Sequence, residues 1–258
     1  MSLFDDVRPC AGCRGPAGPI CARCGHAFRA PAFRVDRPGT LALPVVASAT
    51  YDGPVREALI AFKDHGRWSL RDVLGASLGH ALSRLLAGRL EQRREPAELP
   101  PLGGLEVPDL SAFPAAPRAV RFLLVPVPST RASVRARDGD HVTELAERAE
   151  ERLPRLVLHT VPGLMVVRRR HDQVGLGRAE RAANLAGSMR ATDTLLRRAS
   201  PPGTGVVLID DIVTTGATLA EAHRALLAAG IHPWGAAVVA ATPDLPRRGV
   251  PGSGHRVR

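Results

Sequence analysis

Residues 206–218 read Val-Val-Leu-Ile-Asp-Asp-Ile-Val-Thr-Thr-Gly-Ala-Thr, and this stretch decides the fold. The apolar run 206–209 has the length and β-branched content of a strand buried on both faces of a parallel sheet. After the acidic pair and the hydroxyl-rich turn, apolar residues recur at helical spacing until Gly230, a residue type that commonly ends helices. The stretch therefore predicts a strand, a polar turn at the carboxyl end of the strand, and a helix.

The polar turn has the groups that a sugar phosphate requires. Backbone N–H groups at a helix N-terminus and three threonine hydroxyls favour a phosphate monoester, and Gly216 lets the backbone approach it closely. Asp210 and Asp211 would repel that phosphate, so we expect them to accept hydrogen bonds from sugar hydroxyls or to help hold a hydrated divalent cation. A ribose 5-phosphate satisfies both halves of the motif. The alternative is an ordinary strand-to-helix turn with a capping threonine.

A nucleoside-triphosphate P-loop does not fit this turn. That motif needs Gly-x-x-x-x-Gly-Lys-Ser/Thr, and the only lysine of the chain, Lys63, is far from the turn along the sequence. We therefore exclude the nucleoside triphosphatases as a function class.

The same thirteen residues resemble the phosphoribosyl-pyrophosphate binding motif of type I phosphoribosyltransferases. The resemblance implies that Asp210 and Asp211 contact the ribose 2′- and 3′-hydroxyls, and that the following loop wraps the 5-phosphate. That loop consists of Thr214, Thr215, Gly216, Ala217 and Thr218. Magnesium is the expected divalent cation, with the two aspartates as its candidate ligands.

All four cysteines lie near the front of the chain as two Cys-x-x-Cys pairs. They are Cys10, Cys13, Cys21 and Cys24. Two such pairs can close tetrahedrally around one zinc ion, whereas disulfides, the alternative, are uncommon in a cytosolic chain. Four thiolates leave zinc no position for water, so we predict a structural zinc whose ligation contributes on the order of 10 kcal/mol to folding of this segment.

A second apolar run, residues 121–129, ends in Pro-Val-Pro-Ser, which cannot continue a sheet ladder. In type I phosphoribosyltransferases the loop at the equivalent place holds pyrophosphate. The resemblance assigns this role to Val127, Pro128, Ser129, Thr130 and Arg131. A solvated basic turn is the alternative.

A third strand is predicted at 164–167, and an arginine-rich segment follows it. This segment falls where type I enzymes have a flexible loop that closes over the reacting centre and excludes water. The candidates in it to meet pyrophosphate or another polyanion are Arg170, Gln173, Arg178 and Arg181. A solvated basic start of a helix explains the same residues.

The four-cysteine motif, residues 51–66 and the arginine-rich segment together resemble ComF-type proteins. That resemblance implies a cytoplasmic role in natural competence and in uptake of transforming single-stranded DNA. Two function classes stay open. One is a phosphoribosyltransferase that acts on phosphoribosyl pyrophosphate and an unidentified acceptor, with no catalytic residue assigned. The other is a non-catalytic module that binds single-stranded DNA and a helicase-like partner and uses the same fold for ligand sensing.

The order of elements predicts the architecture and the domain organisation. Alternating strands and helices imply an α/β fold with a doubly wound parallel sheet of the type I phosphoribosyltransferase type, with a small N-terminal zinc ribbon. We assign residues 1–40 to the zinc-binding module and linker, 41–243 to the phosphoribosyltransferase-like domain and 244–258 to a basic tail. Within the domain, residues 91–118 are rich in proline and read as a disordered insertion.

The composition of the chain limits the kinds of partner that we expect. The formal net charge of +10 suggests polyanionic partners, but the excess is nearly all arginine. The chain has nine aromatic residues (six Phe, two Trp and one Tyr), so a grip on single-stranded DNA would rest on phosphate contacts and be sensitive to salt. We expect a soluble, cytoplasmic protein with no membrane insertion, because we find neither an apolar run of about 18 residues nor the start of a signal peptide.

Overall fold

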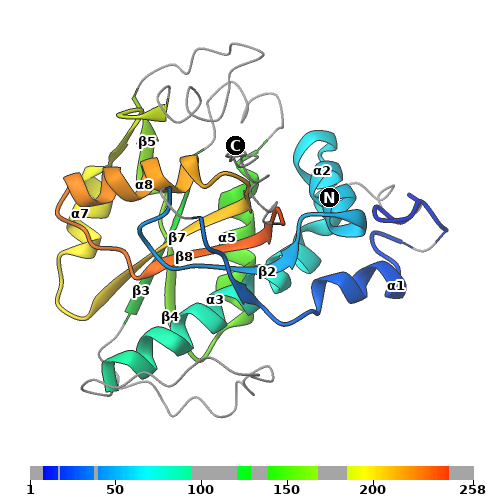
Figure 1. Cartoon of the computed structure of the whole chain (residues 1–258), viewed down its shortest axis with the longest axis horizontal. Helices are drawn as coiled ribbons and strands as arrows, with labels where there is room; N and C mark the ends of the chain where they lie inside the picture. The colour runs from blue at the N-terminus through cyan, green and yellow to red at the C-terminus, as the bar shows by residue number, and fades with distance from the viewer. Residues whose placement is uncertain are drawn as a thin grey trace, which may run out of the picture.

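A six-stranded sheet forms the centre of the computed structural model, which describes residues 8–16, 18–37, 40–94, 121–128, 139–167 and 185–243 (Figure 1). Its strands are β1 (Phe33–Arg34), β2 (Val45–Thr50), β3 (Arg121–Pro126), β4 (Val157–Thr160), β7 (Thr204–Val213) and β8 (Gly235–Ala241). The spatial order is β1-β2-β8-β7-β3-β4. Only the short edge strand β1 runs antiparallel to its neighbour in this sheet, and the other adjacent pairs are parallel.

Helices cover both faces of this sheet. The first face carries α2 (Gly53–His65), α3 (Arg71–Arg94) and α5 (His141–Arg152), and the second carries α7 (Asp193–Ala199) and α8 (Ala217–Ala228). Side chains of a strand alternate between its two faces. In β7, Val207 and Ile209 therefore join the core beneath the first helices, while Val206 and Leu208 join the core beneath the second. The predicted α/β fold with a doubly wound, mostly parallel sheet is confirmed.

A long helix, α3, follows Trp68. A short 3-10 turn, η3 (Trp68–Leu70), leads into α3, which continues to Arg94 and so includes the first residues of the segment 91–118. The rest of that segment and the tail 244–258 lie outside the described residues. Among the helices that are described, none combines the length and the apolar composition that crossing a membrane requires.

The strand predicted at 164–167 lies outside the main sheet. As β5 (Leu164–Val166) it pairs antiparallel with β6 (Met189–Ala191) in a separate two-stranded sheet. The parallel neighbour of β3 is instead β4, which was not predicted. Only Leu158 of β4 is buried, because β4 is the edge of the sheet, and so short a strand has too weak an apolar pattern to be recognised.

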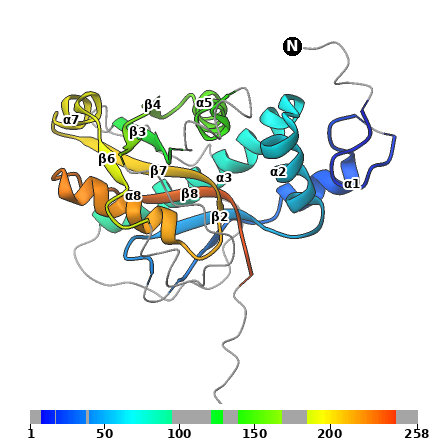
Figure 2. The same ribbon diagram turned by 90° about the horizontal axis from the view of Figure 1, so that it is seen from above.

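The cysteine-containing segment packs beside α2 at one end of the molecule (Figure 2). Its regular elements are α1 (Ala22–Gly25) and η2 (His26–Phe28), and Phe28 reaches the core beneath α3. Gly12 approaches the start of α2 so closely that a Cβ there would lie 2.9 Å from Pro54. Arg67, directly before η3, adds to this contact, because its Nη2 donates to the carbonyls of Arg8 and Gly18 at 3.3 Å. The segment is thereby attached to the first helical face.

Candidate functional site

The junction of β7 and α8 carries the acidic pair and the hydroxyl-rich loop. Asp210 and Asp211 lie inside β7, not after it, because pairing with β8 continues through Val213 and Ala241. The chain then bends through 214–216 and enters α8. Gly216 has φ of +84°, and a Cβ there would lie 2.8 Å from the Leu41 side chain. Both the left-handed backbone and the contact with Leu41 therefore require glycine at this position.

The predicted phosphate loop presents its polar groups at the N-terminus of α8. Thr214 is exposed, and the Thr215 hydroxyl accepts the Ala217 amide at 3.3 Å. Arg37 holds the loop from outside: its Nε donates to the Thr214 carbonyl at 2.9 Å, and its Nη2 lies 3.3 Å from Thr242 Oγ1. The first amides of a helix have no intrahelical acceptor, so this end of α8 can donate to an anion.

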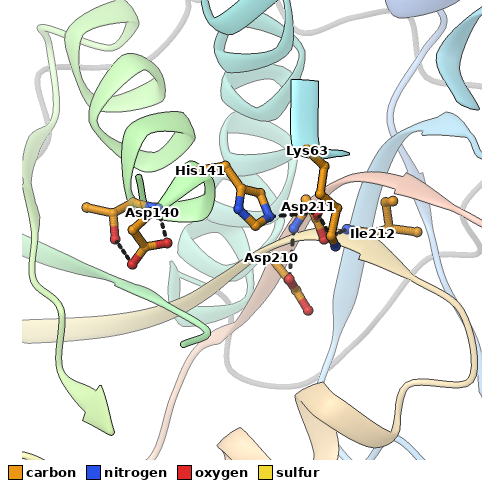
Figure 3. Close-up of polar contacts among 7 residues, drawn as sticks. Lys63, Asp140, His141, Asp210, Asp211 and Ile212 are labelled. Carbon is orange, nitrogen blue, oxygen red and sulfur yellow. Dashed lines mark hydrogen bonds and ion pairs between the residues drawn. The ribbon is translucent and has the colours of Figure 1, made fainter. Parts of the chain in front are cut away.

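Asp211 is the centre of a buried polar cluster (Figure 3). Its Oδ2 accepts from Lys63 Nζ at 2.7 Å and from His141 Nε2 at 3.1 Å, and its Oδ1 accepts the Ile212 amide at 2.8 Å. The side chains of Asp211 and His141 are 4% and 3% exposed, and that of Lys63 is 29% exposed. Both carboxylate oxygens of Asp211 are thus already bonded to the protein itself.

The pKa values of the two neighbouring carboxyl groups are shifted in opposite directions. Burial alone would raise the pKa of Asp211, but the hydrogen bond from His141 and the charge of Lys63 outweigh it and hold this pKa well below its ordinary value. Burial and the neighbouring Asp211 charge raise the pKa of Asp210 well above its ordinary value, and Lys63 counteracts this only in part. Asp210 therefore ionises less readily than its neighbour.

The predicted pyrophosphate loop begins next to this acidic pair. Strands β3 and β7 are parallel neighbours, and the Val127 amide donates to the Ile209 carbonyl at 2.8 Å. Val127 is buried and Pro128 is half-buried. The structure thus brings the first two residues of that loop to the strand position before Asp210. Ser129, Thr130 and Arg131 lie outside the described residues.

The residues predicted for the flexible loop, Arg170, Gln173, Arg178 and Arg181, also lie outside the described residues. The two ends of that segment meet in the small sheet, where Val166 pairs with Met189. A buried carboxylate of α8 anchors this sheet: Glu221 accepts the amides of Met189 at 2.8 Å and Gly187 at 3.1 Å. Arg224 neutralises Glu221 at 2.7 Å. Helix α8, which follows the phosphate loop, therefore also holds residues 187–189 of the small sheet.

The four cysteines form a cluster whose sulfur atoms all lie within 4.8 Å of one another. Cys13 Sγ and Cys21 Sγ are 3.7 Å apart, close to the separation of about 3.8 Å between thiolates of a tetrahedral site with Zn–S bonds of about 2.3 Å. The Cys21 amide donates to Cys10 Sγ at 3.2 Å, which suits a thiolate. The donor set and its geometry fit a structural zinc ion, for which Cys10, Cys13, Cys21 and Cys24 are the ligands.

The thiols of this cluster repel one another as anions. Burial would raise the pKa of Cys10, but the amide hydrogen bonds from Cys21, Cys13 and Gly12 prevail and lower it to about 6. Burial and the neighbouring sulfur atoms raise the pKa of Cys24 to about 12. A bound divalent metal would relieve this repulsion, because a coordinated thiol is deprotonated.

Three polar residues of the site were missed in the sequence. Lys63 and His141 lie 148 and 70 residues before Asp211, and Arg37 lies 177 residues before Thr214. Lys63 could be noticed as the single lysine of the chain, and His141 as the residue after a capping Asp140. No local pattern marks Arg37, since arginine is frequent throughout the sequence.

Comparison with known protein families agrees with this geometry. Residues 146–248 match the family model described as the phosphoribosyl transferase domain. The match contains β7, the acidic pair, the hydroxyl-rich loop and α8. The match lies in the second half of the chain, and the four-cysteine cluster precedes it near the N-terminus. No curated protein matches the chain.

Proposed function

We propose that the β7–α8 junction binds phosphoribosyl pyrophosphate together with Mg²⁺. The observation that carries the proposal is the adjacency of an acidic strand end, residues 210–211, and the amide-rich start of α8 behind Gly216. The acidic end suits neutral sugar hydroxyls, and the helix end suits the 5-phosphate. The match to the phosphoribosyl transferase domain supports the same ligand class.

Pyrophosphate is assigned to the loop that starts at Val127. Its first residues lie beside Ile209, one residue before the acidic pair, so a sugar held there has its C1 end near this loop. Mg²⁺ in such sites is commonly held by one or two carboxylates and by the phosphates of the substrate. Asp210 is the candidate protein ligand, because both oxygens of Asp211 already bind protein groups. The cation would neutralise charge on the pyrophosphate.

Transfer of the phosphoribosyl group to an acceptor is the reaction class that this ligand implies. An acceptor nucleophile attacks C1 of the ribose, the C1–O bond to pyrophosphate breaks, and Mg²⁺-pyrophosphate leaves with the electron pair. The segment 168–184 is proposed to cover the reacting centre. The link to competence and DNA uptake, and the role of a cytoplasmic ComF-like protein, rest on the resemblance of the sequence motifs alone.

Calorimetric titration with phosphoribosyl pyrophosphate and Mg²⁺ tests the binding step, and pyrophosphate release across a panel of nucleobases tests transfer. We expect saturable binding that Asp210→Asn weakens and that Asp193→Asn, a change at an exposed aspartate on α7, leaves intact. Binding with turnover on one base identifies a transferase and its acceptor. Binding without turnover favours the non-catalytic module, and absence of binding by the wild-type protein refutes the proposal.

A further inference from the structure

Three separate segments of the chain converge on a single carboxylate. Lys63 comes from the last turn of α2, His141 is the first residue of α5, and Asp211 lies in β7 (Figure 3). Lys63 and His141 bind the same oxygen of Asp211, at 2.7 and 3.1 Å. A single oxygen that accepts from two side chains, while the other oxygen accepts a backbone amide, is fixed in position.

Each donor lies beside a helix end with a defined cap. Helix α2 ends at Gly66 in the left-handed conformation, directly after the turn that carries Lys63. Asp140 caps the start of helix α5: its carboxylate accepts the Thr143 hydroxyl at 2.8 Å and so fixes the position of His141. Phe62 lies against the His141 ring with a centroid distance of 6.3 Å. The two donors therefore hold Asp211 without any ligand.

The aromatic packing behind the donors continues to the start of α5. The rings of Phe62 and Trp68 meet edge to face at 5.3 Å, and a Cβ on Gly139 would lie 2.8 Å from the Trp68 ring. The chain thus passes tightly over Trp68 just before it presents His141. The positions of Lys63 and His141 therefore depend on the same aromatic contacts.

The alternation of side chains along β7 separates the two aspartates. Asp211 lies on the face of α2, α3 and α5, as Ile209 does, while Asp210 lies on the face of α8, as Leu208 does. Figure 3 shows the Asp210 carboxylate pointing away from Lys63 and His141. The start of α8 carries the hydroxyl-rich loop, so Asp210 is the aspartate on the side of the proposed phosphate site.

We propose that Lys63 and His141 are positioning residues that hold Asp211 away from the ligand, so that Asp210 alone of the acidic pair contacts the ribose hydroxyls. This inference rests on the proposed function, since it takes the sugar phosphate to bind at the β7–α8 junction. It departs from the expectation that both aspartates contact the ribose. Asp211 contributes by fixing three segments around the strand end, and Lys63 compensates its charge.

The test compares the affinities of ribose 5-phosphate and 2-deoxyribose 5-phosphate, which differ by one hydroxyl. We expect the wild-type protein to prefer ribose 5-phosphate by about tenfold or more, the size of a hydrogen bond to a charged group. Asp210→Asn should bring the ratio of affinities close to one. Lys63→Met should weaken both sugars by about tenfold and leave their ratio unchanged, because it disturbs the position of the acidic pair and not the recognition of the hydroxyl.

Matched variants separate positioning from general effects. Lys63→Arg keeps the positive charge and should retain most of the affinity that Lys63→Met loses. His141→Gln should likewise bind more tightly than His141→Ala, because glutamine still supplies a hydrogen-bond donor. Arg56→Met removes a positive charge from an exposed ion pair on the same helix and should change neither affinity nor ratio. Loss of the ratio in Lys63→Met with retention in Asp210→Asn overturns the inference.

A crystal structure of the wild-type protein with ribose 5-phosphate provides a second measurement that needs no variant. We expect the Lys63–Asp211 and His141–Asp211 contacts to persist, with Asp210 within hydrogen-bond distance of a ribose hydroxyl. An Asp211 carboxylate turned to the ribose, with Lys63 displaced, contradicts the inference. If the wild-type protein binds neither ribose 5-phosphate nor phosphoribosyl pyrophosphate, the proposed function itself fails.

Discussion

Lys63 Nζ and Asp211 Oδ2 lie 2.7 Å apart, although 148 residues separate them in the chain. The contact joins the end of α2, which precedes the matched phosphoribosyl transferase region, to the strand at the centre of that region. Lys63 is far from the β7–α8 turn along the sequence, which already argues against a P-loop lysine. The structure adds a second reason, because the Lys63 ammonium group pairs with the buried Asp211 carboxylate. The stability of this part of the fold and the geometry of the candidate site therefore depend on the same residue.

Loss of the Asp211 charge should destabilise the protein. Asp211→Asn keeps one acceptor oxygen but removes the negative charge that pairs with Lys63, and breaking a buried ion pair costs about 3–5 kcal/mol. Because Lys63 is 29% exposed and can be hydrated, we expect the lower end of this range, about 3 kcal/mol. Urea denaturation measures the change as a lower midpoint with an unchanged m-value. An unchanged midpoint would show that the cluster contributes nothing to stability.

Asp210→Asn should act in the opposite direction. The substitution removes a buried carboxyl that burial and Asp211 disfavour as an anion, so we expect the free energy of unfolding near neutral pH to rise by about 1 kcal/mol. The affinity for ribose 5-phosphate should fall at the same time. The pair of substitutions thus separates stability from binding, and a destabilised Asp210→Asn protein would contradict the assignment.

The two aspartates also predict a pH dependence of stability with two opposing parts. The folded-state pKa of Asp211 is lowered, so its contribution is fully present above its ordinary value of 3.8 and is lost as pH falls below it. The folded-state pKa of Asp210 is raised, so stability falls as pH rises from 3.8 toward that pKa. Urea midpoints at several pH values should show the second decline in the wild-type protein and not in Asp210→Asn.

The zinc prediction concerns metal content and thiol reactivity. We expect one zinc ion per chain and slow reaction of thiol reagents with the folded protein, because all four cysteines of the chain lie in the cluster. Chelation should release the zinc, expose the thiols and lower the melting temperature. His26→Ala, next to the cluster but outside its ligand set, should keep the metal. Reduced thiols without bound metal would refute the prediction.

Gly216→Ala tests the backbone of the phosphate loop. The left-handed conformation of residue 216 costs a non-glycine residue about 1–2 kcal/mol, and the clash with Leu41 adds about 1–3 kcal/mol. Gly230→Ala is the matched control, because its φ is +74° but no atom lies within 4 Å of an added Cβ. We expect thermal denaturation to show a clearly larger loss for Gly216→Ala. Addition of Leu41→Ala should recover the steric part, and equal losses for the two glycines would contradict the role of Leu41.

Arg37→Lys should weaken phosphate binding more than it weakens the fold. The guanidinium bonds two separate points, the Thr214 carbonyl and the Thr242 hydroxyl, and an ammonium group cannot reproduce this forked geometry. We expect about tenfold weaker binding of ribose 5-phosphate and a loss of about 1 kcal/mol in stability. Arg34→Lys alters an exposed ion pair with Asp36 and serves as the control. Equal affinities of the two variants would show that Arg37 does not position the loop.

The sequence alone was sufficient for the features that short-range patterns encode. The apolar runs at 206–209 and within 121–129 indicated buried parallel strands, because such strands contact helices on both faces, and the second strand ends at Pro126. The helical spacing of apolar residues after Gly216 predicted α8, and Gly230 predicted its end, because glycine readily adopts the left-handed conformation that follows many helices. The cysteine spacing predicted the cluster, since two Cys-x-x-Cys turns bring four sulfur atoms together within one short segment.

Only the tertiary structure decided how the acidic pair is divided. The sequence predicts the same role for Asp210 and Asp211, but pairing with β8 keeps both in an extended strand, which turns them to opposite faces. It then takes the packing of α2 and α5 on one of those faces to bring Lys63 and His141 to Asp211. Contacts over 148 and 70 residues leave no local pattern, because they depend on where whole helices pack against the sheet.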